Sequence, residues 1–289
     1  MVVKAINENR DCGSVLAMTV WRIIQMKKVI NVLAILLVAA MAIASVSCGG
    51  GNADVNAEIP TVTPGKLTMS TNADFPPYEF IAGGQVVGID PDIAAAIAEK
   101  LGLELEIMNI DFDSVIISVE TGMADIAMAG LTVTEERMEQ INFSTSYAKG
   151  VQVIIVPEGS SITSVDDLFA DGAFHSIGVQ LSTTGDLYST WDLEEEGLAS
   201  IERYPKGTDA VMALLAGRVD AVIIDNEPAR HFVELNPGLK ILDTEFADED
   251  YAIGINKGNT VLFERLNQAL NELIADGTVK AIVDNYITV

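Results

Sequence analysis

Hydrophobic residues recur along most of the chain with two different spacings, and the two spacings alternate. Short apolar runs at residues 66–70 and 103–110 have the length and composition of strands. Between these runs, Ile93, Ile97 and Leu101 lie at the spacing of one helix face. Strands that alternate with helices predict an α/β fold, in which mostly parallel sheets are covered by helices.

Local signals mark where the helices begin and end. Asp90 followed by Pro91 predicts an N-cap with a proline at the first helical position, and Gly102 predicts the end of that helix. Asp113 is expected to cap the next helix, which should end at Gly122. Each of these helices therefore begins at an acidic residue and ends at a glycine.

Residues 129–137 follow a buried run, 125–128, and should leave it through Gly130. We expect a turn with free backbone N–H groups and two threonine hydroxyls, followed by a short helix that carries Arg137. Such a turn would bind one small anion, most naturally a carboxylate. An ordinary strand–helix junction with a surface arginine is an equally open interpretation of this segment alone.

The layout of residues 122–128 recurs at 217–223: a helix end, a tight turn and a buried strand. The first copy runs into residues 130–132 and the second into Asp225. Two similar units predict two lobes, each with polar groups beyond the carboxyl end of a strand, where ligands bind in open α/β sheets. Coincidence is the alternative, because Gly-x-x-Asp before a strand is common.

Two further β-rich segments are interpreted as the connections between these lobes. They are residues 151–157 and 250–255, which flank the second unit. We therefore expect one lobe to comprise residues 66–150 together with 254–289, and the other lobe to comprise residues 151–253.

The first 65 residues have a different character. Residues 26–47 combine a basic start, an apolar run and small residues, and Cys48 follows directly. This pattern is typical of a secretory signal, and with the cysteine in that place it resembles a bacterial lipoprotein signal, whose cysteine is lipidated. A retained membrane anchor is the alternative, although the run is short for a spanning helix. Residues 48–65 should form a flexible tether, and residues 1–25 suggest a start codon assigned too far upstream.

Charge and motifs exclude several classes of function. The chain has 42 Asp and Glu against 17 Lys and Arg, a formal charge of −25, and such a surface repels nucleic acid. Two cysteines, Cys12 and Cys48, provide no disulfide framework. The histidines, His175 and His231, fall in no recognisable motif, and we find no phosphate-binding loop, nucleophile elbow or metal-ligand spacing. We expect no catalytic site, metal or cofactor.

Six segments of the chain carry a resemblance when they are taken in order: 71–80, 88–92, 111–113, 129–137, 178–185 and 220–225. Together they resemble the extracytoplasmic polar amino-acid-binding proteins of ABC importers, the family 3 solute-binding proteins. The resemblance covers residues 66–287. It implies a two-lobed clamshell of the periplasmic-binding-protein type (type II) with a two-strand hinge, which captures a polar amino acid in its cleft and delivers it to an ABC permease.

The resemblance also implies how the two charged ends of an amino acid would be held. Arg137 would bind the α-carboxylate through a bidentate fork, and the backbone N–H and hydroxyl of Thr132 would share it. Thr184, near a helix start in the other lobe, would add an N–H. Asp225 and the carbonyl of Gly130 would take the α-ammonium.

The ligand side chain would lie between Phe75 and Phe112, which would exclude water from it. Asn72 stands where members that select cationic side chains often have Asp, which argues against a strong Lys or Arg preference. Gln180 occupies a variable position near the ligand side chain, and the two amides leave the specificity open. Thr183 completes the set of candidate ligand-binding residues.

These residues have structural alternatives. Phe75 and Phe112 would be plain core residues, and Asp225 would be the N-cap of a helix over Asn226–Leu235. Thr183 and Thr184 would be capping groups only. Capping and ligand binding are compatible for Asp225.

The resemblance favours a monomer outside the cytoplasm, lipid-anchored through Cys48 to the outer face of the cytoplasmic membrane or periplasmic. Two other functions stay open on the same fold. One is an enzyme similar to cyclohexadienyl dehydratases, which needs a poised acid in the cleft. The other is a ligand-binding partner of a separate sensor.

Overall fold

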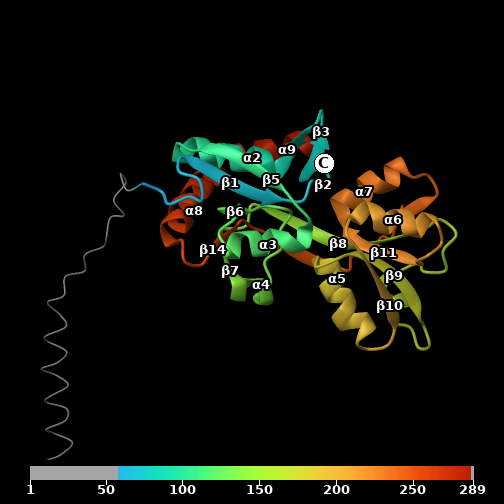
Figure 1. Ribbon diagram of the computed structural model, residues 1–289. Coiled ribbons are helices and arrows are strands. Elements are labelled where there is room, and N and C mark those ends of the chain that lie inside the picture. Colours follow the sequence, from blue (N-terminus) through green and yellow to red (C-terminus); the bar gives the residue numbers. More distant parts are fainter. Residues whose placement is uncertain (1–57, 288–289) are drawn as a thin grey trace, which may run out of the picture. The chain divides into compact units, whose positions relative to one another are not determined.

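The computed structural model describes residues 58–287, and Figure 1 shows two groups of helices and strands in this part of the chain. The predicted upstream start, the signal segment, Cys48 and the tether as far as residue 57 lie outside the described residues. Residues 59–65, at the end of the predicted tether, contact the folded body. The backbone N–H of Val62 donates to Oδ1 of Asp125 at 2.7 Å.

The first sheet, with its helices, forms lobe 1. Its strand order is β5-β1-β6-β14-β7, and the first three strands are parallel, whereas β14 pairs antiparallel with both of its neighbours. The strands are β1 (Lys66–Thr71), β5 (Glu104–Asn109), β6 (Ile126–Ala127), β7 (Ile141–Phe143) and β14 (Gly254–Asn256). The helices are α2 (Ile89–Leu101), α3 (Phe112–Glu120), α4 (Glu135–Gln140), α8 (Thr260–Ala275) and α9 (Thr278–Tyr286). A small antiparallel sheet comprises β2 (Asp74–Phe75), β3 (Glu79–Ala82) and β4 (Gln85–Val87).

The second sheet, with its helices, forms lobe 2. Its order is β10-β9-β11-β8-β12, and β13 also pairs with β8. The strands are β8 (Ala148–Pro157), β9 (His175–Gln180), β10 (Ala199–Tyr204), β11 (Ala221–Asp225), β12 (Leu239–Ile241) and β13 (Ala247–Tyr251). The helical segments are η1 (Val165–Leu168), α5 (Thr184–Ser189), η2 (Thr190–Glu194), α6 (Gly207–Leu215) and α7 (Asn226–Leu235).

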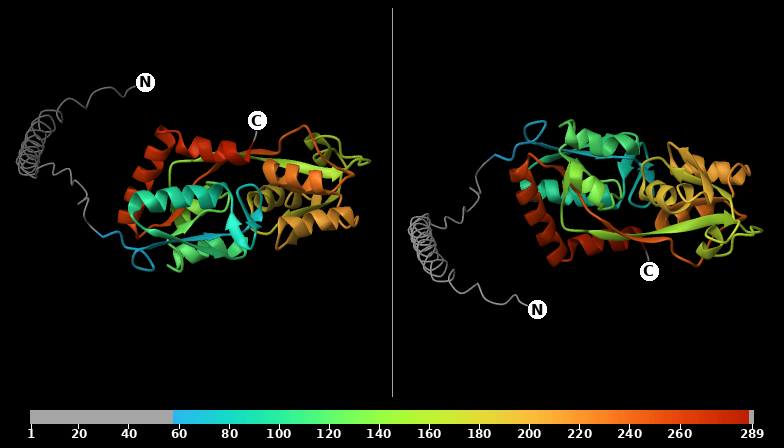
Figure 2. Two further views of the ribbon diagram at one scale, coloured as in Figure 1. Left: turned by 90° about the horizontal axis from the view of Figure 1, so that it is seen from above. Right: turned by 90° about the horizontal axis from the view of Figure 1, so that it is seen from below.

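Strands β8 and β13 connect the lobes, as the two further views in Figure 2 show. They pair antiparallel from Ala148 opposite Tyr251 to Gln152 opposite Ala247. One strand leaves lobe 1 and the other returns to it, so the two must run in opposite directions. Both sheets combine parallel with antiparallel pairs, whereas mostly parallel sheets were expected. The predicted second connection, residues 250–255, overlaps only the end of β13, because β14 belongs to the first sheet.

Both predicted acidic N-caps in lobe 1 are wrong by a small shift. Helix α2 has Gly88 at its N-cap, and α3 has Asp111 there, in neither case with a side-chain cap hydrogen bond. Asp113 therefore lies in the first turn of α3. Asp90 is fully buried inside α2, where its carboxylate accepts from the N–H of Gly130 at 2.9 Å and from the hydroxyl of Tyr147 at 2.7 Å. The carboxylate of Asp90 thus bonds to distant residues and does not cap its own helix.

The core of lobe 1 forms where α2 and α8 pack together on one side of the first sheet. Ile93 and Ile97 of α2 lie in the same buried cluster as Leu262 and Leu266 of α8. Each such side chain stabilises the fold by about 1.5–3 kcal/mol relative to full exposure. Within residues 58–287, no helix is long and apolar enough to cross a membrane.

The repeat seen in the sequence is also a repeat in structure. Gly122 and Gly217 follow α3 and α6 with φ of 74° and 65°, a left-handed conformation that favours glycine. In the two turns, Asp125 accepts from the backbone N–H of Thr68 at 2.8 Å, and Asp220 accepts from that of Ser176 at 2.8 Å. Each aspartate thus anchors its turn to the neighbouring parallel strand, β1 in lobe 1 and β9 in lobe 2.

Candidate functional site

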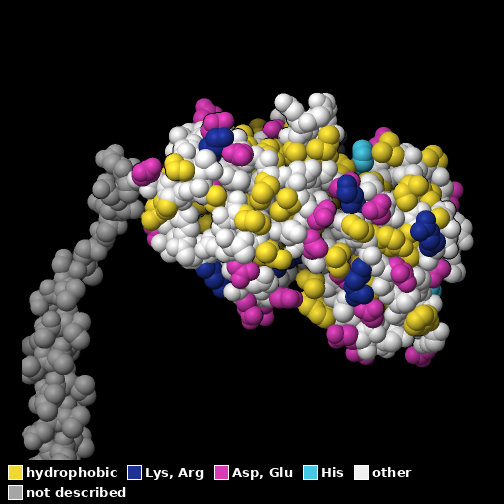
Figure 3. Space-filling view, in the orientation of Figure 1, with side chains coloured by type: hydrophobic (Ala, Val, Ile, Leu, Met, Phe, Trp, Pro, Cys, Tyr) yellow, Lys and Arg dark blue, Asp and Glu magenta, His cyan; other side chains and the backbone are white. Residues whose placement is uncertain are grey.

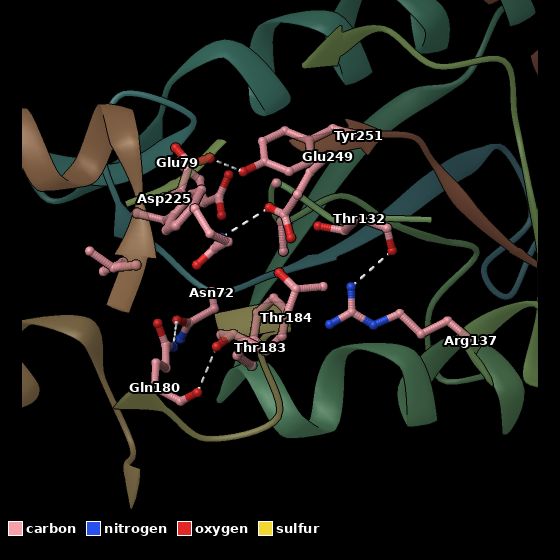
Figure 4. Close-up of a pocket in the computed structure, with 16 residues that line it drawn as sticks. Asn72, Glu79, Thr132, Arg137, Gln180, Thr183, Thr184, Asp225, Glu249 and Tyr251 are labelled. Atoms are coloured by element: carbon pink, nitrogen blue, oxygen red, sulfur yellow. Dashed lines mark hydrogen bonds between the residues drawn. The ribbon is translucent and has the colours of Figure 1, made fainter. Parts of the chain in front are cut away.

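A cavity between the lobes is lined by all ten candidate residues of the sequence analysis (Figure 4). Its empty volume is about 420 Å³, which includes space open to solvent. Most of these residues stand at or just beyond the carboxyl ends of β1, β6, β9 and β11, where open α/β sheets bind ligands. The candidates are Asn72, Phe75, Phe112, Gly130, Thr132 and Arg137 from lobe 1, and Gln180, Thr183, Thr184 and Asp225 from lobe 2.

Arg137 is buried, with only 4% of its surface exposed. The alternative prediction, a strand–helix junction with a surface arginine, is therefore wrong. Thr134 caps α4 and accepts the backbone N–H of Arg137 at 3.1 Å, which fixes the start of the helix. The guanidinium donates to the carbonyls of Thr132 at 2.9 Å and of Ser182 in lobe 2 at 3.1 Å, and it lies 5.6 Å from the ring centre of Phe112. Among the described residues no carboxylate forms an ion pair with it. Its charge is therefore available to an anion.

Asp225 is the buried anion on the other side of the cavity, and it is fully enclosed. It caps α7, as the structural alternative predicted, because Oδ1 accepts from the N–H of Glu227 at 3.0 Å. Oδ2 accepts from the N–H of Val151 at 3.2 Å and from the hydroxyl of Tyr251. Burial raises the pKa of Asp225 to about 7. A Cβ at Gly150 would lie 2.5 Å from this carboxylate, so the hinge strand needs glycine there.

The two phenylalanines line the cavity without being fully buried. Phe75 packs against core clusters of both lobes, so its core and cavity roles coexist. Its ring also explains why residue 130 is a glycine. Gly130 has φ of 54°, and a Cβ atom at this position would lie 2.6 Å from Cε1 of Phe75. Phe112 begins α3 and faces the guanidinium of Arg137.

The two amides form a contact between the lobes. Nε2 of Gln180 donates to Oδ1 of Asn72 at 3.0 Å, and both side chains are buried. The amide of Asn72 also donates to the carbonyl of Ile110 at 2.9 Å. The end of the cavity that the amides line therefore offers neutral donors and acceptors.

Thr183 and Thr184 start α5. Thr183 is the N-cap and accepts from the N–H of Asp186 at 3.3 Å, so its predicted capping role is confirmed. Thr184 is the first helical residue and is buried against the cavity. Ligand contact by either residue stays a prediction.

Four further polar residues line the cavity and were not predicted from the sequence. Gln152 on β8 donates to Glu249 on β13 at 2.9 Å, and Tyr251 lies two residues further along the same strand. The sequence contains one signal for Glu249 and Tyr251: they alternate with the exposed acids Asp248 and Asp250. Every second residue of a strand faces the same side, so Glu249 and Tyr251 could have been predicted to share the inner face. The fourth is Glu79 on β3, inside the segment 71–80 that carried part of the resemblance.

The cavity contains buried acceptors that lack a donor. Within residues 58–287, six buried side-chain atoms lack a hydrogen-bond partner, and four of them belong to residues that line this cavity. All four are carboxyl or amide oxygens, and burial raises the pKa of both glutamates involved. A ligand with several N–H donors and a positive charge would suit them. The atoms are Oε1 and Oε2 of Glu79, Oε1 of Gln152 and Oε1 of Glu249.

The family model of the bacterial extracellular solute-binding proteins, family 3, matches residues 67–289. The chain belongs to this family. Among family 3 relatives, a probable histidine-binding protein of Neisseria gonorrhoeae is 31% identical over 86% of this chain and 92% of its own length. ABC transporter arginine-binding protein 1 of Escherichia coli is 30% identical over 76% of this chain and 90% of its own. A solved ancestral arginine-binding protein bound to glutamine has a TM-score of 0.71 and 38% identity, and it covers 78% of this chain and 99% of its own.

The comparisons confirm the two-lobed clamshell fold and the predicted family. Family 3 proteins are extracellular solute-binding proteins. The described residues contain no group of three or more His, Cys, Asp or Glu arranged to hold a metal ion. On the face shown in Figure 3, acidic side chains are spread over both lobes and basic ones are fewer, in keeping with the net charge of −25.

Proposed function

We propose that this family 3 protein captures one amino acid between its lobes and delivers it to an ABC permease. The observation that carries the proposal is the pair Arg137 and Asp225, one buried guanidinium and one buried carboxyl group in a single cavity. Burying unlike charges apart from each other is costly unless each finds a partner. A zwitterion has one charge for each.

The α-carboxylate would replace the backbone carbonyls as the partner of Arg137 and would also accept from Thr132. Thr184 would contact the same group from lobe 2. The α-ammonium would donate to Asp225 and to the carbonyl of Gly130. Because these contacts come from both lobes, ligand binding would favour the closed over the open arrangement.

The identity of the amino acid is the finer part of the proposal. The relatives are named for histidine and arginine, and the solved relative holds glutamine. The amides of Asn72 and Gln180 suit a neutral polar side chain, whereas the unpaired carboxyl and amide oxygens suit a cation. We therefore propose a polar amino acid and let binding decide among these three.

We also propose that the protein is a monomer held at the outer face of the cytoplasmic membrane by a lipid on Cys48. The support is the signal pattern of residues 26–47 and the extracellular location of the family. Mass spectrometry of the protein from membranes would detect the lipid on the cysteine. An unprocessed N-terminus ahead of Cys48 would contradict this part.

The test of the function is a thermal-shift screen of the twenty amino acids with the chain from Asn52 onwards, stripped of bound ligand by unfolding and refolding. A ligand at 1,000 times its dissociation constant stabilises a fold by about 4 kcal/mol. We expect one group of polar amino acids to raise the melting temperature. Arg137→Met should abolish the rise, and Arg218→Met, which changes an exposed arginine, should not.

Two outcomes would contradict the proposal. One is no response to any amino acid, which would favour another solute or turnover of prephenate or arogenate. The other is tight binding retained by Arg137→Met, which would remove the carboxylate assignment.

A further inference from the structure

Glu79 is the least satisfied carboxyl group of the cavity. It lies on β3, is fully buried and lines the cavity, and neither of its oxygens accepts from an N–H or hydroxyl group of the described residues. Its one polar neighbour within hydrogen-bond reach is another acid, Asp90, and two carboxyl groups can bond to each other only if one of them holds a proton. An ionised carboxylate offers about four acceptor positions, and burying it without partners is strongly unfavourable. Such a group requires either a proton or a donor from a bound molecule.

Asp225 lies near Glu79 but, unlike Glu79, accepts several hydrogen bonds from the protein. Figure 4 shows both carboxyls on the same side of the cavity, next to the ring of Tyr251. Asp225 already accepts from Tyr251 and from the backbone N–H groups of Val151 and Glu227, so most of its acceptor positions are taken. The free acceptor capacity at this side of the cavity therefore belongs to Glu79.

We propose that Glu79 and Asp225 together form a two-carboxyl subsite for the cationic group of the ligand. In the function proposed above, on which this inference rests, that group is the α-ammonium. An ammonium group has three donors, and the site offers it three acceptors: Glu79, Asp225 and the carbonyl of Gly130. Glu79 is thus a ligand-binding residue in addition to the ten candidates of the sequence analysis.

The subsite couples binding to proton release. Burial raises the pKa of Glu79 well above its usual value, and the neighbouring Asp90 and Asp225 raise it further. Without ligand, protons therefore occupy part of this carboxyl cluster near neutral pH. A bound cation favours the ionised forms, so binding releases protons and the affinity rises as the pH rises. The titratable groups near Glu79 are Tyr78, Asp90, Tyr147 and Asp225. Glu249 and Tyr251 lie near Asp225.

A purely structural role for Glu79 gives a different expectation. In that role a protonated Glu79 would donate a hydrogen bond to Asp90 and would not contact the ligand. Glutamine has the same shape and also carries a donor. Glu79→Gln therefore keeps the structural role and removes only the negative charge.

The experiment is isothermal titration calorimetry of the full chain between pH 5.5 and 8, in buffers of different ionisation enthalpy. The probes are L-arginine, L-glutamine and L-histidine, together with 5-guanidinopentanoate, which is arginine without its α-amino group. We expect the wild type to release protons on binding the amino acid that it accepts. Glu79→Gln should bind that amino acid roughly ten- to a hundredfold more weakly at pH 8 and release fewer protons. Glu99→Gln, on the exposed face of α2, should behave as the wild type.

The inference is overturned if Glu79→Gln matches the wild type in affinity and in the number of protons released. It is also overturned if the wild type binds its amino acid with no proton release and no pH dependence, a result that does not require the variant to fold. Any binding of 5-guanidinopentanoate should be unaffected by Glu79→Gln, and a loss for this probe would assign Glu79 to the ligand side chain instead. Failure of the proposed function is distinct, because the wild type would then bind no amino acid at any pH.

Discussion

Arg137 and Asp225 show how burial prepares single residues for binding. The guanidinium has backbone carbonyls as its hydrogen-bond acceptors, and Asp225 has two backbone N–H groups and one hydroxyl as donors. These contacts hold each group in place without cancelling its charge. Burial lowers the pKa of Arg137 and raises that of Asp225, so both charged forms would gain from an opposite charge in the ligand.

Tyr251→Phe should weaken binding in a pH-dependent way. The hydroxyl donates to Asp225 and thereby lowers the pKa of its carboxyl, so its loss should raise that pKa above about 7. At pH 7 less of Asp225 is then ionised, and we expect the affinity for the amino acid to fall severalfold and to recover at higher pH. Dissociation constants measured from pH 6 to 9 test this. Tyr286→Phe, which removes an exposed hydroxyl bond to Asp92, is the control, and parallel pH profiles for Tyr251→Phe and the wild type would contradict the prediction.

Short elements with defined ends place the site residues. The turn after β6 leads into α4 and Arg137, and β11 ends at Asp225, which caps α7. The same arrangement of glycine, aspartate and buried strand precedes both segments. Each lobe thus carries one charged end of the site on the carboxyl side of its sheet.

Thr134→Ala tests whether the cap of α4 positions Arg137. The hydroxyl of Thr134 accepts the backbone N–H of Arg137, and loss of an N-cap costs about 1 kcal/mol of stability. We expect the alanine variant to unfold at lower denaturant concentration and to bind the amino acid several times more weakly. Thr134→Ser keeps the hydroxyl and should have the stability and affinity of the wild type. If the serine and alanine variants behave alike, Thr134 does not position Arg137 through this hydroxyl.

At the scale of the whole molecule, contacts between the lobes hold the closed arrangement. Gln180 bonds to Asn72, and Arg137 bonds to the carbonyl of Ser182, inside the cavity. Outside it, the hydroxyl of Thr208 on α6 donates to Asp74 on β2 at 3.0 Å. Because the last contact does not involve the ligand cavity, it can be changed without changing the site.

Thr208→Val should therefore weaken binding through the equilibrium between open and closed lobes. A lost hydrogen bond of about 1 kcal/mol favours the open arrangement by roughly fivefold and reduces the apparent affinity by a similar factor. Small-angle scattering of the ligand-free protein should show a larger radius of gyration. Thr61→Val removes a hydroxyl bond within one lobe and should change neither quantity. Wild-type affinity of Thr208→Val would show that this contact does not contribute to closure.

The buried acids also predict how the stability of the ligand-free protein depends on pH. Asp90 and Asp225 have pKa values raised to about 6 and about 7, against roughly 3.9 when unfolded. Between about pH 4 and 7 the folded state therefore binds more protons than the unfolded state, so stability falls as the pH rises. We expect a lower melting temperature at pH 7.5 than at pH 5 by calorimetry, and a smaller difference with bound amino acid. A stability that rises over this interval would contradict the assignment.

The sequence alone was sufficient for features that depend on neighbouring residues. The helix over Asn226–Leu235 with Asp225 as its N-cap was predicted to the residue, because capping and helical spacing are local properties. The glycine turns before β6 and β11 were likewise readable from the repeat. The ten candidate residues came from the order of six segments in a family resemblance, and the structure brings all ten to one cavity.

Only the tertiary structure decided which carboxyls are buried and what they contact. Asp90 has the sequence signature of an N-cap, but its carboxylate accepts from Gly130, forty positions along the chain. Glu79, Gln152 and Glu249 line the cavity because β3, β8 and β13 meet there. Neither burial nor pKa can be obtained from local spacing, because desolvation depends on which distant segments pack around a group. For the same reason, only the folded chain shows that the cavity holds more acidic groups than a zwitterion needs.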